Sequence, residues 1–125
     1  MQKQKVAVVG LGRVGAAFLD ELLCLTGKGI KVAYAVEKFD TPGKKMAEAA
    51  GVQILSIDEL IALGEAVDII FDLTGVPKVR KELREKLYGT SNRHTVIAPE
   101  NIAHFIWSIM SDTALPVIEG RKAGY

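Results

Sequence analysis

The chain has 125 residues, of which 49% are hydrophobic and 25% are charged, and its formal net charge at pH 7 is +1. This length predicts a single domain, and this composition is typical of a folded chain rather than a disordered one. A net charge so close to zero does not indicate nucleic acid as a partner. No apolar run approaches the roughly 18 residues of a membrane span, and the N-terminal run is too short for a signal peptide. We therefore expect a cytoplasmic protein with no membrane partner.

The first half of the chain alternates strand and helix signals. The β-branched run at 5–9 ends at a glycine and predicts a buried strand, and a helix at 13–25 follows it. A second strand is expected at 31–37. The next helix is expected over 42–50, because Thr41 has the chemistry of an N-cap and a proline occupies the first helical position.

The second half continues this alternation. A short strand at 52–55 precedes Ser56 and Glu59, whose spacing is that of a capping box at the start of a short helix. The later elements are expected at 67–73 (strand), 76–87 (helix), 94–98 (strand) and 99–110 (helix). The pattern predicts a doubly wound parallel sheet of about five strands, in a three-layer α/β/α domain. We expect this domain to occupy residues 1–111, and 112–125 to form a C-terminal tail that is either a loose end or an arm that packs on a partner subunit.

Three glycines follow the first predicted strand with the spacing G-x-G-x-x-G, at Gly10, Gly12 and Gly15. Between a strand and a helix, this spacing is typical of a dinucleotide-binding turn. Gly10 would permit a tight turn, Gly12 would let the backbone approach a pyrophosphate, and Gly15 would let the helix lie close to the sheet. The N–H groups of Arg13 and Val14, at the start of the helix, would face the phosphates.

An acidic residue ends the second predicted strand. Glu37 lies about 20 residues after the glycine turn, where a carboxylate can accept hydrogen bonds from both hydroxyls of an adenosine ribose. It would repel a 2′-phosphate and so favours NAD over NADP as the cofactor, although the neighbouring Lys38 could tolerate that phosphate. A second interpretation stays open, in which the glycines serve only turns and packing in a fold whose site is empty or altered.

The stretches VAVVGLGRVG, AYAVE and VDIIFDLTG together resemble the NAD(P)-binding Rossmann domain of homoserine- and aspartate-dehydrogenase-type oxidoreductases. The resemblance covers roughly residues 5–98 and implies a Rossmann-like fold. It also implies that the DLTG turn lies beside the nicotinamide ribose. With Lys38 included, the candidate cofactor-binding residues are Gly10, Leu11, Gly12, Arg13, Val14, Gly15, Glu37, Lys38, Leu73, Thr74, Gly75 and Val76.

Two functions follow from this resemblance. Those dehydrogenases carry a substrate and dimerisation domain after the nucleotide-binding domain, whereas this sequence stops soon after its fifth predicted strand. A looser similarity, through DLTG and HTVIAPENIAHFIWSIM, is to Rossmann-like sensory domains of bacterial histidine kinases. We therefore expect an NAD(P)-binding sensory or regulatory module. The alternative is a small NAD(P)-dependent oxidoreductase whose active site is completed by oligomerisation or by another chain.

The sequence assigns no catalytic residue and no substrate. A scaffold or partner-binding domain that retains the fold is a third possibility, because a fold alone does not determine a function. The candidates to line a substrate pocket are Asp72, Lys78, Asn101 and His104. No metal site is expected, because the two histidines lie ten residues apart with no third ligand nearby.

The last predicted helix is apolar on more than one side. Its core face is expected to comprise Ile102, Phe105, Ile106 and Ile109, which share helical spacing. Trp107 and Met110 then form a second apolar edge, with His104 off the core face. This second edge predicts a homodimer that forms through the last helix and the tail.

Three other features have simpler interpretations. Cys24 is expected to be a buried small side chain, and His94 a surface residue at the start of a strand. The segment 78–89 interleaves basic and acidic residues and is expected to be a solvated helix face, with Glu82 and Lys86 as a favourable pair.

Overall fold

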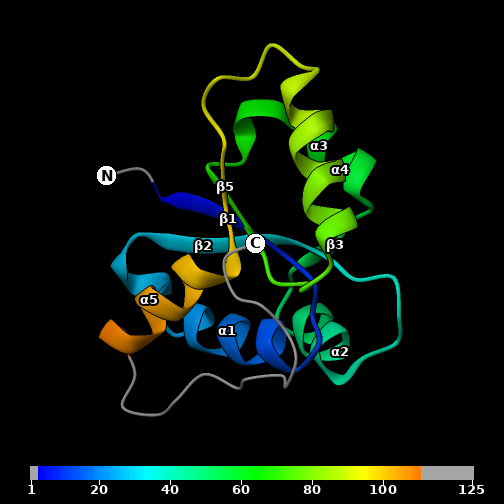
Figure 1. Cartoon of the computed structure of the whole chain (residues 1–125). Coiled ribbons are helices and arrows are strands. Elements are labelled where there is room, and N and C mark those ends of the chain that lie inside the picture. The colour runs from blue at the N-terminus through cyan, green and yellow to red at the C-terminus, as the bar shows by residue number, and fades with distance from the viewer. Residues whose placement is uncertain (1–2, 111–125) are drawn as a thin grey trace.

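The computed structural model describes residues 3–110, in which strands and helices alternate in chain order (Figure 1). The strands are β1 (Gln4–Val9), β2 (Ile30–Val36), β3 (Gln53–Ile54), β4 (Ile69–Asp72) and β5 (Val96–Ala98). The α-helices are α1 (Arg13–Leu23), α2 (Pro42–Ala49), α3 (Ile57–Ala62), α4 (Pro77–Tyr88) and α5 (Glu100–Met110). Short 3₁₀ turns lie at Thr26–Lys28 and Gly64–Ala66. The predicted tail at 112–125 lies outside the described residues.

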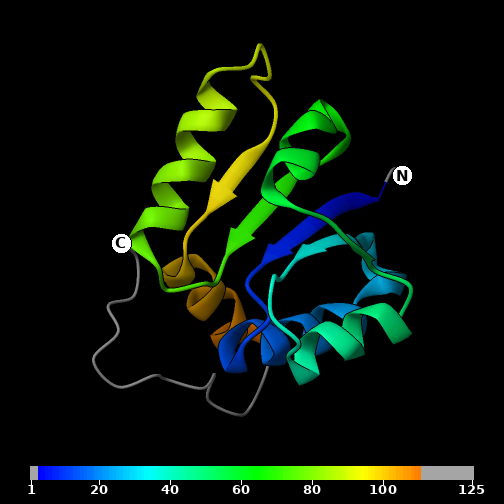
Figure 2. The same ribbon diagram turned by 90° about the vertical axis from the view of Figure 1, so that its right-hand side faces the viewer.

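The five strands form one sheet in the order β3-β2-β1-β4-β5, and all neighbouring pairs are parallel. Figure 2 shows the strand arrows pointing the same way, so that their carboxyl ends meet at one edge of the sheet. The strand order reverses between β1 and β4, and ligands of such sheets bind beyond the carboxyl ends at this point. The doubly wound parallel sheet predicted from the sequence is therefore confirmed.

Helices cover both faces of the sheet (Figures 1 and 2). On one face, buried side chains of α1 and α5 pack with β1, β2 and β4, and the rings of Phe18 and Phe71 meet edge to face at 4.9 Å. On the other face, Leu60 of α3 and Leu83 of α4 pack on Ala7 and Ile70. The central strands are therefore buried on both sides, which explains their nearly continuous apolar sequences.

Side chains cap α2 and α3 as the sequence predicts. The hydroxyl of Thr41 accepts a hydrogen bond from the backbone N–H of Lys44 at 3.1 Å. The Ser56 hydroxyl accepts from Glu59 N–H, and the Glu59 carboxylate accepts from Ser56 N–H, which makes the capping box complete. The predicted pair of Glu82 and Lys86 is also present, at 2.8 Å.

The predicted core face of α5 is wrong for Ile102, Phe105 and Ile109, and right for Ile106. Ala103 and Trp107 are the side chains that pack into the core, and Ile106 and Met110 pack partly against it. The exposed side is formed by Ile102 (41% exposed), Phe105 (64%) and Ile109 (72%). The polar residues Asn101, His104 and Ser108 share one side of the helix, but the apolar arc beside them is wide, so periodicity alone does not choose which part of it is buried. A small residue one turn before a tryptophan lets α5 approach the sheet closely, and that contact decides the face. The predicted homodimer stays a prediction. The apolar side chains of α5 that are available for such a contact are Ile102, Phe105 and Ile109, because Trp107 is buried within the domain.

Cys24 is a second correction, because its side chain is exposed rather than buried. It lies just after the last residue of α1, where its thiol donates to the carbonyl of Asp20 at 3.5 Å. The neighbouring Leu22 takes the buried position instead. None of the helices in residues 3–110 has the length and apolar character to cross a membrane.

An acid and a histidine join the amino ends of the strands, far from the predicted site. Asp68 accepts a hydrogen bond from the backbone N–H of Lys5 at 2.7 Å and pairs with the ring of His94, which is exposed as predicted. The hydrogen bond from His94 and then that from Lys5 hold the pKa of Asp68 below its ordinary value. Asp68 thus links β1, β4 and the segment that precedes β5.

We expect Asp68→Asn to lower the free energy of unfolding at pH 7 by about 0.5–1 kcal/mol, because the lost pair is partly exposed to water. The folded pKa is depressed, so the stabilisation is complete above the unfolded pKa and is lost as the pH falls below about 4. Urea unfolding at pH 7 and pH 3 should therefore show a difference between the variants only at pH 7. Asp20→Asn, on the exposed side of α1, is the control. An Asp68→Asn deficit that persists unchanged at pH 3 would contradict this role.

Candidate functional site

Two loops meet at the carboxyl edge of the sheet, one after β1 and one after β4. Gly10 has a φ of +94°, a conformation that L side chains rarely adopt. A Cβ atom at Gly10 would lie 2.9 Å from both the backbone nitrogen and the Cγ2 atom of Thr74. Glycine at this position therefore lets the loop that follows β1 lie directly against the DLTG turn.

The third glycine of the motif has an even closer neighbour. A Cβ atom at Gly15 would lie 1.8 Å from the carbonyl oxygen of Gly10, which is shorter than any non-bonded contact. This places the first turn of α1 directly over the end of β1. The proximity predicted for helix and sheet at Gly15 is confirmed.

The second glycine differs from the other two. A Cβ atom at Gly12 would meet no atom within 4 Å, and the residue is exposed with a φ of −77°. Neither a positive φ nor a contact within the described chain calls for glycine here. Gly12 is the N-cap of α1, and the first intrahelical bond runs from Ala16 N–H to its carbonyl at 2.8 Å. The N–H groups of Arg13 and Val14 precede that bond, as in helix starts that bind anions.

Glu37 follows β2 directly and its carboxylate turns back to the glycine loop. One oxygen accepts the N–H of Leu11 at 2.7 Å, and the other accepts the N–H of Phe39 at 3.1 Å. The Leu11 side chain is fully buried and its N–H is used within the chain. Each carboxylate oxygen can accept a second hydrogen bond, so Glu37 retains capacity for ligand hydroxyls.

The start of α2 supports the same loop from the other side. The Thr41 hydroxyl donates to the carbonyl of Leu11 at 2.9 Å while it caps α2. A Cβ atom at Gly43 would lie 2.5 Å from that same carbonyl, so α2 begins in direct contact with the loop. The glycine loop is therefore held by β2, α2 and the DLTG turn together.

The DLTG turn is ordered around Asp72, the last residue of β4. Asp72 Oδ1 accepts the N–H and the hydroxyl of Thr74, at 3.2 Å and 2.8 Å, and the Thr74 hydroxyl in turn accepts the N–H of Val76. Asp72 is only 2% exposed, and its other oxygen, Oδ2, is buried without a hydrogen-bond partner among residues 3–110. An unsatisfied buried carboxylate oxygen is costly, at about 1–3 kcal/mol or more, so it calls for an explanation.

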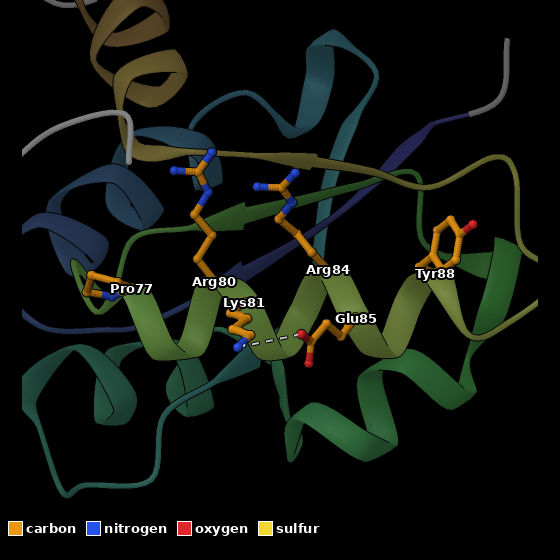
Figure 3. A pocket seen from close by; sticks show the side chains of 6 residues that line it. All are labelled: Pro77, Arg80, Lys81, Arg84, Glu85 and Tyr88. Atoms are coloured by element: carbon orange, nitrogen blue, oxygen red, sulfur yellow. Dashed lines mark ion pairs between the residues drawn. The ribbon is translucent and has the colours of Figure 1, made fainter.

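A small cavity lies beside this carboxylate, with a volume of about 270 Å³. It is lined by Asp72, Arg80, Arg84, Ile97 and Pro99. Figure 3 shows Arg80 and Arg84 projecting from α4 on the side of β5, whereas Lys81 and Glu85 pair with each other along the helix at 3.9 Å. The solvated face predicted at 78–89 is present, with Arg84 exposed and Arg80 half-buried, and these two arginines also line the cavity.

The cavity adjoins a wider groove along α4, whose volume is about 610 Å³. The groove is lined by Pro77, Arg80, Lys81, Arg84, Glu85 and Tyr88 (Figure 3). Arg80 and Arg84 line both hollows.

The remaining residues proposed to line a substrate pocket do not line this cavity. Lys78 and Asn101 are exposed, and His104 is half-buried with its ring 3.6 Å from the buried Glu100. Of the four residues proposed to line a substrate pocket, Asp72 lines the cavity beside β4. In residues 3–110 there is no group of three or more His, Cys, Asp or Glu side chains that could hold a metal ion.

Phe39 lies at this edge of the sheet but is not among the site residues predicted from the sequence. Phe39 is 64% exposed, its backbone N–H bonds the Glu37 carboxylate, and the ammonium group of Lys38 lies 5.3 Å from the centre of its ring. An aromatic residue two positions after the acid that follows β2 was the available signal. Lys38 is exposed and is positioned over this ring.

No protein-family model matches the chain, and no curated protein is significantly similar to it. Solved structures do match it. A homoserine dehydrogenase of S. aureus superposes with a TM-score of 0.57 at 14% identity, over 88% of this chain and 30% of its own. A glucose dehydrogenase of Haloferax mediterranei, also solved with NADP, Zn and gluconolactone, superposes with a TM-score of 0.55 at 20% identity, over 96% of this chain and 32% of its own.

The chain spans about a third of the length of these two enzymes. At such low identities the likeness concerns the fold. It confirms, at that level, the resemblance to dehydrogenases that the glycine loop and the DLTG turn indicate. The described part of this chain is a single α/β domain of the Rossmann type.

Proposed function

We propose that the carboxyl edge of the sheet binds a nicotinamide dinucleotide, with NAD preferred over NADP. Gly12 is the observation that carries this proposal. Packing and backbone conformation account for glycine at positions 10 and 15, but the described chain makes no demand for it at position 12. A ligand backbone in close approach to the loop would make that demand, because any side chain there would occupy the ligand's place.

Three parts of the edge match three parts of such a ligand. The N–H groups of Arg13 and Val14 would bind the pyrophosphate, while Leu11 acts through its neighbours because its own N–H bonds Glu37. Glu37 would accept the adenosine ribose hydroxyls. The DLTG turn, from Leu73 to Val76, would lie beside the nicotinamide ribose, next to the switch in strand order.

The preference for NAD follows from charge near the adenosine. The Glu37 carboxylate would repel a 2′-phosphate, and the ammonium group of Lys38, the next residue in the chain, lies over the Phe39 ring. The exposed face of Phe39 could stack with the adenine, since stacking needs a flat aromatic surface beside the ribose site. The glucose dehydrogenase, which was solved with NADP, supports the dinucleotide class but not this choice.

We propose further that the domain acts as a sensory or regulatory module that reports on the bound dinucleotide. A redox sensor needs different affinities for the oxidised and reduced cofactor, since a ligand shifts an equilibrium only by its differential binding. Titration with NAD and NADH separately would measure this difference. The alternative is an oxidoreductase completed by a second copy or another chain, and the cavity beside Asp72 is the observation that favours it.

The direct test compares two glycine variants, Gly12→Ala and Gly27→Ala. Both residues have open space where a Cβ atom would be added and neither has a positive φ, but Gly27 lies in the turn after α1, away from the site. Calorimetric titration should show NAD binding at least about 10-fold weaker in Gly12→Ala, a loss of about 1.4 kcal/mol. Gly27→Ala should bind as the parent chain does.

The melting temperature separates loss of binding from loss of folding. NAD at a hundred times its dissociation constant should stabilise the parent chain by about 2.7 kcal/mol, which raises its melting temperature by several degrees. The absence of any shift with NAD, NADH, NADP or NADPH would overturn the proposal. Equal binding by Gly12→Ala and Gly27→Ala would remove the observation on which it rests.

A further inference from the structure

We propose that Asp72 makes the site sensitive to the oxidation state of the nicotinamide, because its carboxylate favours the positively charged ring of NAD over the neutral ring of NADH. This role of Asp72 rests on the proposed function, and it names the residue through which a sensor would distinguish the two forms. NAD and NADH share their adenosine, pyrophosphate and ribose groups and differ only at the nicotinamide ring. A residue that distinguishes them must therefore act at the place where that ring lies.

The order of the strands gives that place. Glu37 follows β2, the glycine loop follows β1 and the DLTG turn follows β4, and these strands lie side by side in the order β2-β1-β4-β5 (Figure 2). A dinucleotide with its adenosine at Glu37 and its nicotinamide ribose at the DLTG turn would therefore extend toward β5. The nicotinamide ring, which is the next group of the ligand, would lie between the ends of β4 and β5.

The cavity of about 270 Å³ lies at these two strand ends. Asp72 is the last residue of β4, Ile97 lies in β5 and Pro99 follows β5, and all three line the cavity. Its volume is below the roughly 300–1,000 Å³ that hold a whole drug-sized ligand, so it suits one ring at the end of a longer ligand. Ile97 and Pro99 would give that ring apolar contacts.

Asp72 brings a buried negative charge to this cavity. It is 2% exposed, its Oδ1 accepts two hydrogen bonds from Thr74, and its Oδ2 has no hydrogen-bond partner within residues 3–110. The ion pairs found in that part of the chain involve other acids. A buried charge is costly without a counter-charge, and solvent screens it little. The cationic ring of NAD would supply the counter-charge, whereas the ring of NADH would not.

The effect of Asp72 is measured as a change in preference when its charge alone is removed. Arg80 and Arg84 also line the cavity, so the absolute preference of the site combines several charges. Asp72→Asn removes one charge and keeps both the size of the side chain and an oxygen that can accept from Thr74. Contacts with the shared parts of NAD and NADH cancel in the ratio of the two affinities, so a change in that ratio reports on the ring.

Calorimetric titration of the chain with NAD and with NADH measures this ratio. We expect the ratio of NAD affinity to NADH affinity to fall by at least about 10-fold in Asp72→Asn. Unit charges several ångströms apart, at an effective dielectric constant of about 20, interact strongly enough for such a change. Benzamide adenine dinucleotide carries a planar, uncharged ring in place of the nicotinamide and so separates charge from ring shape. Its affinity should respond to the substitution as that of NADH does.

Asp68→Asn is the matched control, because it removes the same charge just before β4, at the opposite edge of the sheet. It should leave the ratio unchanged. Asp72→Ser removes the charge without placing an amide group in the buried position, and it should lower the ratio as Asp72→Asn does.

Three results would overturn this role while leaving dinucleotide binding in place. They are an equal weakening of NAD and NADH in both Asp72 variants, a change in the ratio that Asp68→Asn shares, and a benzamide analogue that responds as NAD does. If the parent chain binds neither NAD nor NADH, the proposed function fails and the role of Asp72 fails with it. The two failures are therefore distinguishable.

Discussion

Gly15→Ala is expected to lower the free energy of unfolding by about 3 kcal/mol or more, because the new methyl group would lie 1.8 Å from the carbonyl oxygen of Gly10. Both partners are backbone or bonded directly to it, so no change of rotamer can relieve the overlap. Helix α1 would have to move away from β1, and the core contacts of Val14 and Phe18 would move with it. Such a loss is a large part of the roughly 5–15 kcal/mol by which a domain of this size is stable.

Urea unfolding followed by far-ultraviolet circular dichroism would measure this loss. Gly27→Ala is the matched control, because a Cβ atom there would meet nothing within 4 Å, and its effect should stay below about 1 kcal/mol. The prediction is wrong if Gly15→Ala unfolds within about 1 kcal/mol of the parent chain. That result would mean that α1 can slide along the sheet at little cost.

Glu37→Ala is expected to weaken NAD binding by about 10- to 100-fold, because two charge-assisted hydrogen bonds to the ribose would be lost. NADP should lose far less, or gain, since the carboxylate that repels the 2′-phosphate is also removed. The preference between the two cofactors should therefore shrink or reverse. Calorimetric titration of each variant with NAD and NADP measures both affinities.

Glu37 also holds the glycine loop, so a second variant must separate structure from binding. Its carboxylate accepts hydrogen bonds from Leu11 and Phe39, and Glu37→Ala leaves both N–H groups without that partner. Glu37→Gln keeps one acceptor oxygen for the loop and removes the negative charge. If Glu37 acts only on the loop, NAD and NADP should weaken by the same factor in both variants. Unequal changes, with Glu37→Gln closer to the parent in melting temperature, would support direct contact with the ribose.

Much of the fold could be predicted because its signals are local. The strand at 5–9, the three glycines and the caps at Thr41 and Ser56 are short-range features, and each occurs where the sequence predicts it. The predicted ends of the strands and helices were less accurate than their order. The strand expected at 67–73 spans Ile69–Asp72, although the backbone N–H groups of Asp68 and Leu73 on either side of it still bond β1.

The candidate site divides in the same way. The sequence places Gly10, Gly12 and Gly15 together after the first strand, and it places Glu37 at the end of the second strand. The sequence does not show that the Glu37 carboxylate accepts a hydrogen bond from the N–H of Leu11, because that bond joins the segments that follow two neighbouring strands, β1 and β2. Phe39 was missed because its exposure depends on the course of the β2–α2 connection.

The sequence by itself determined the alternation of strands and helices, and with it the sheet edge at which a ligand would bind. Only the tertiary structure decided which part of the apolar arc of α5 is buried, because so wide an arc allows several packings until the neighbours of the helix are placed. Only the tertiary structure showed that Arg80 and Arg84 lie beside Asp72. The packing of helix α4 on one face of the sheet decides which of its side chains approach the end of β4. Local preference sets the elements of this protein, and long-range packing sets which side chains face one another.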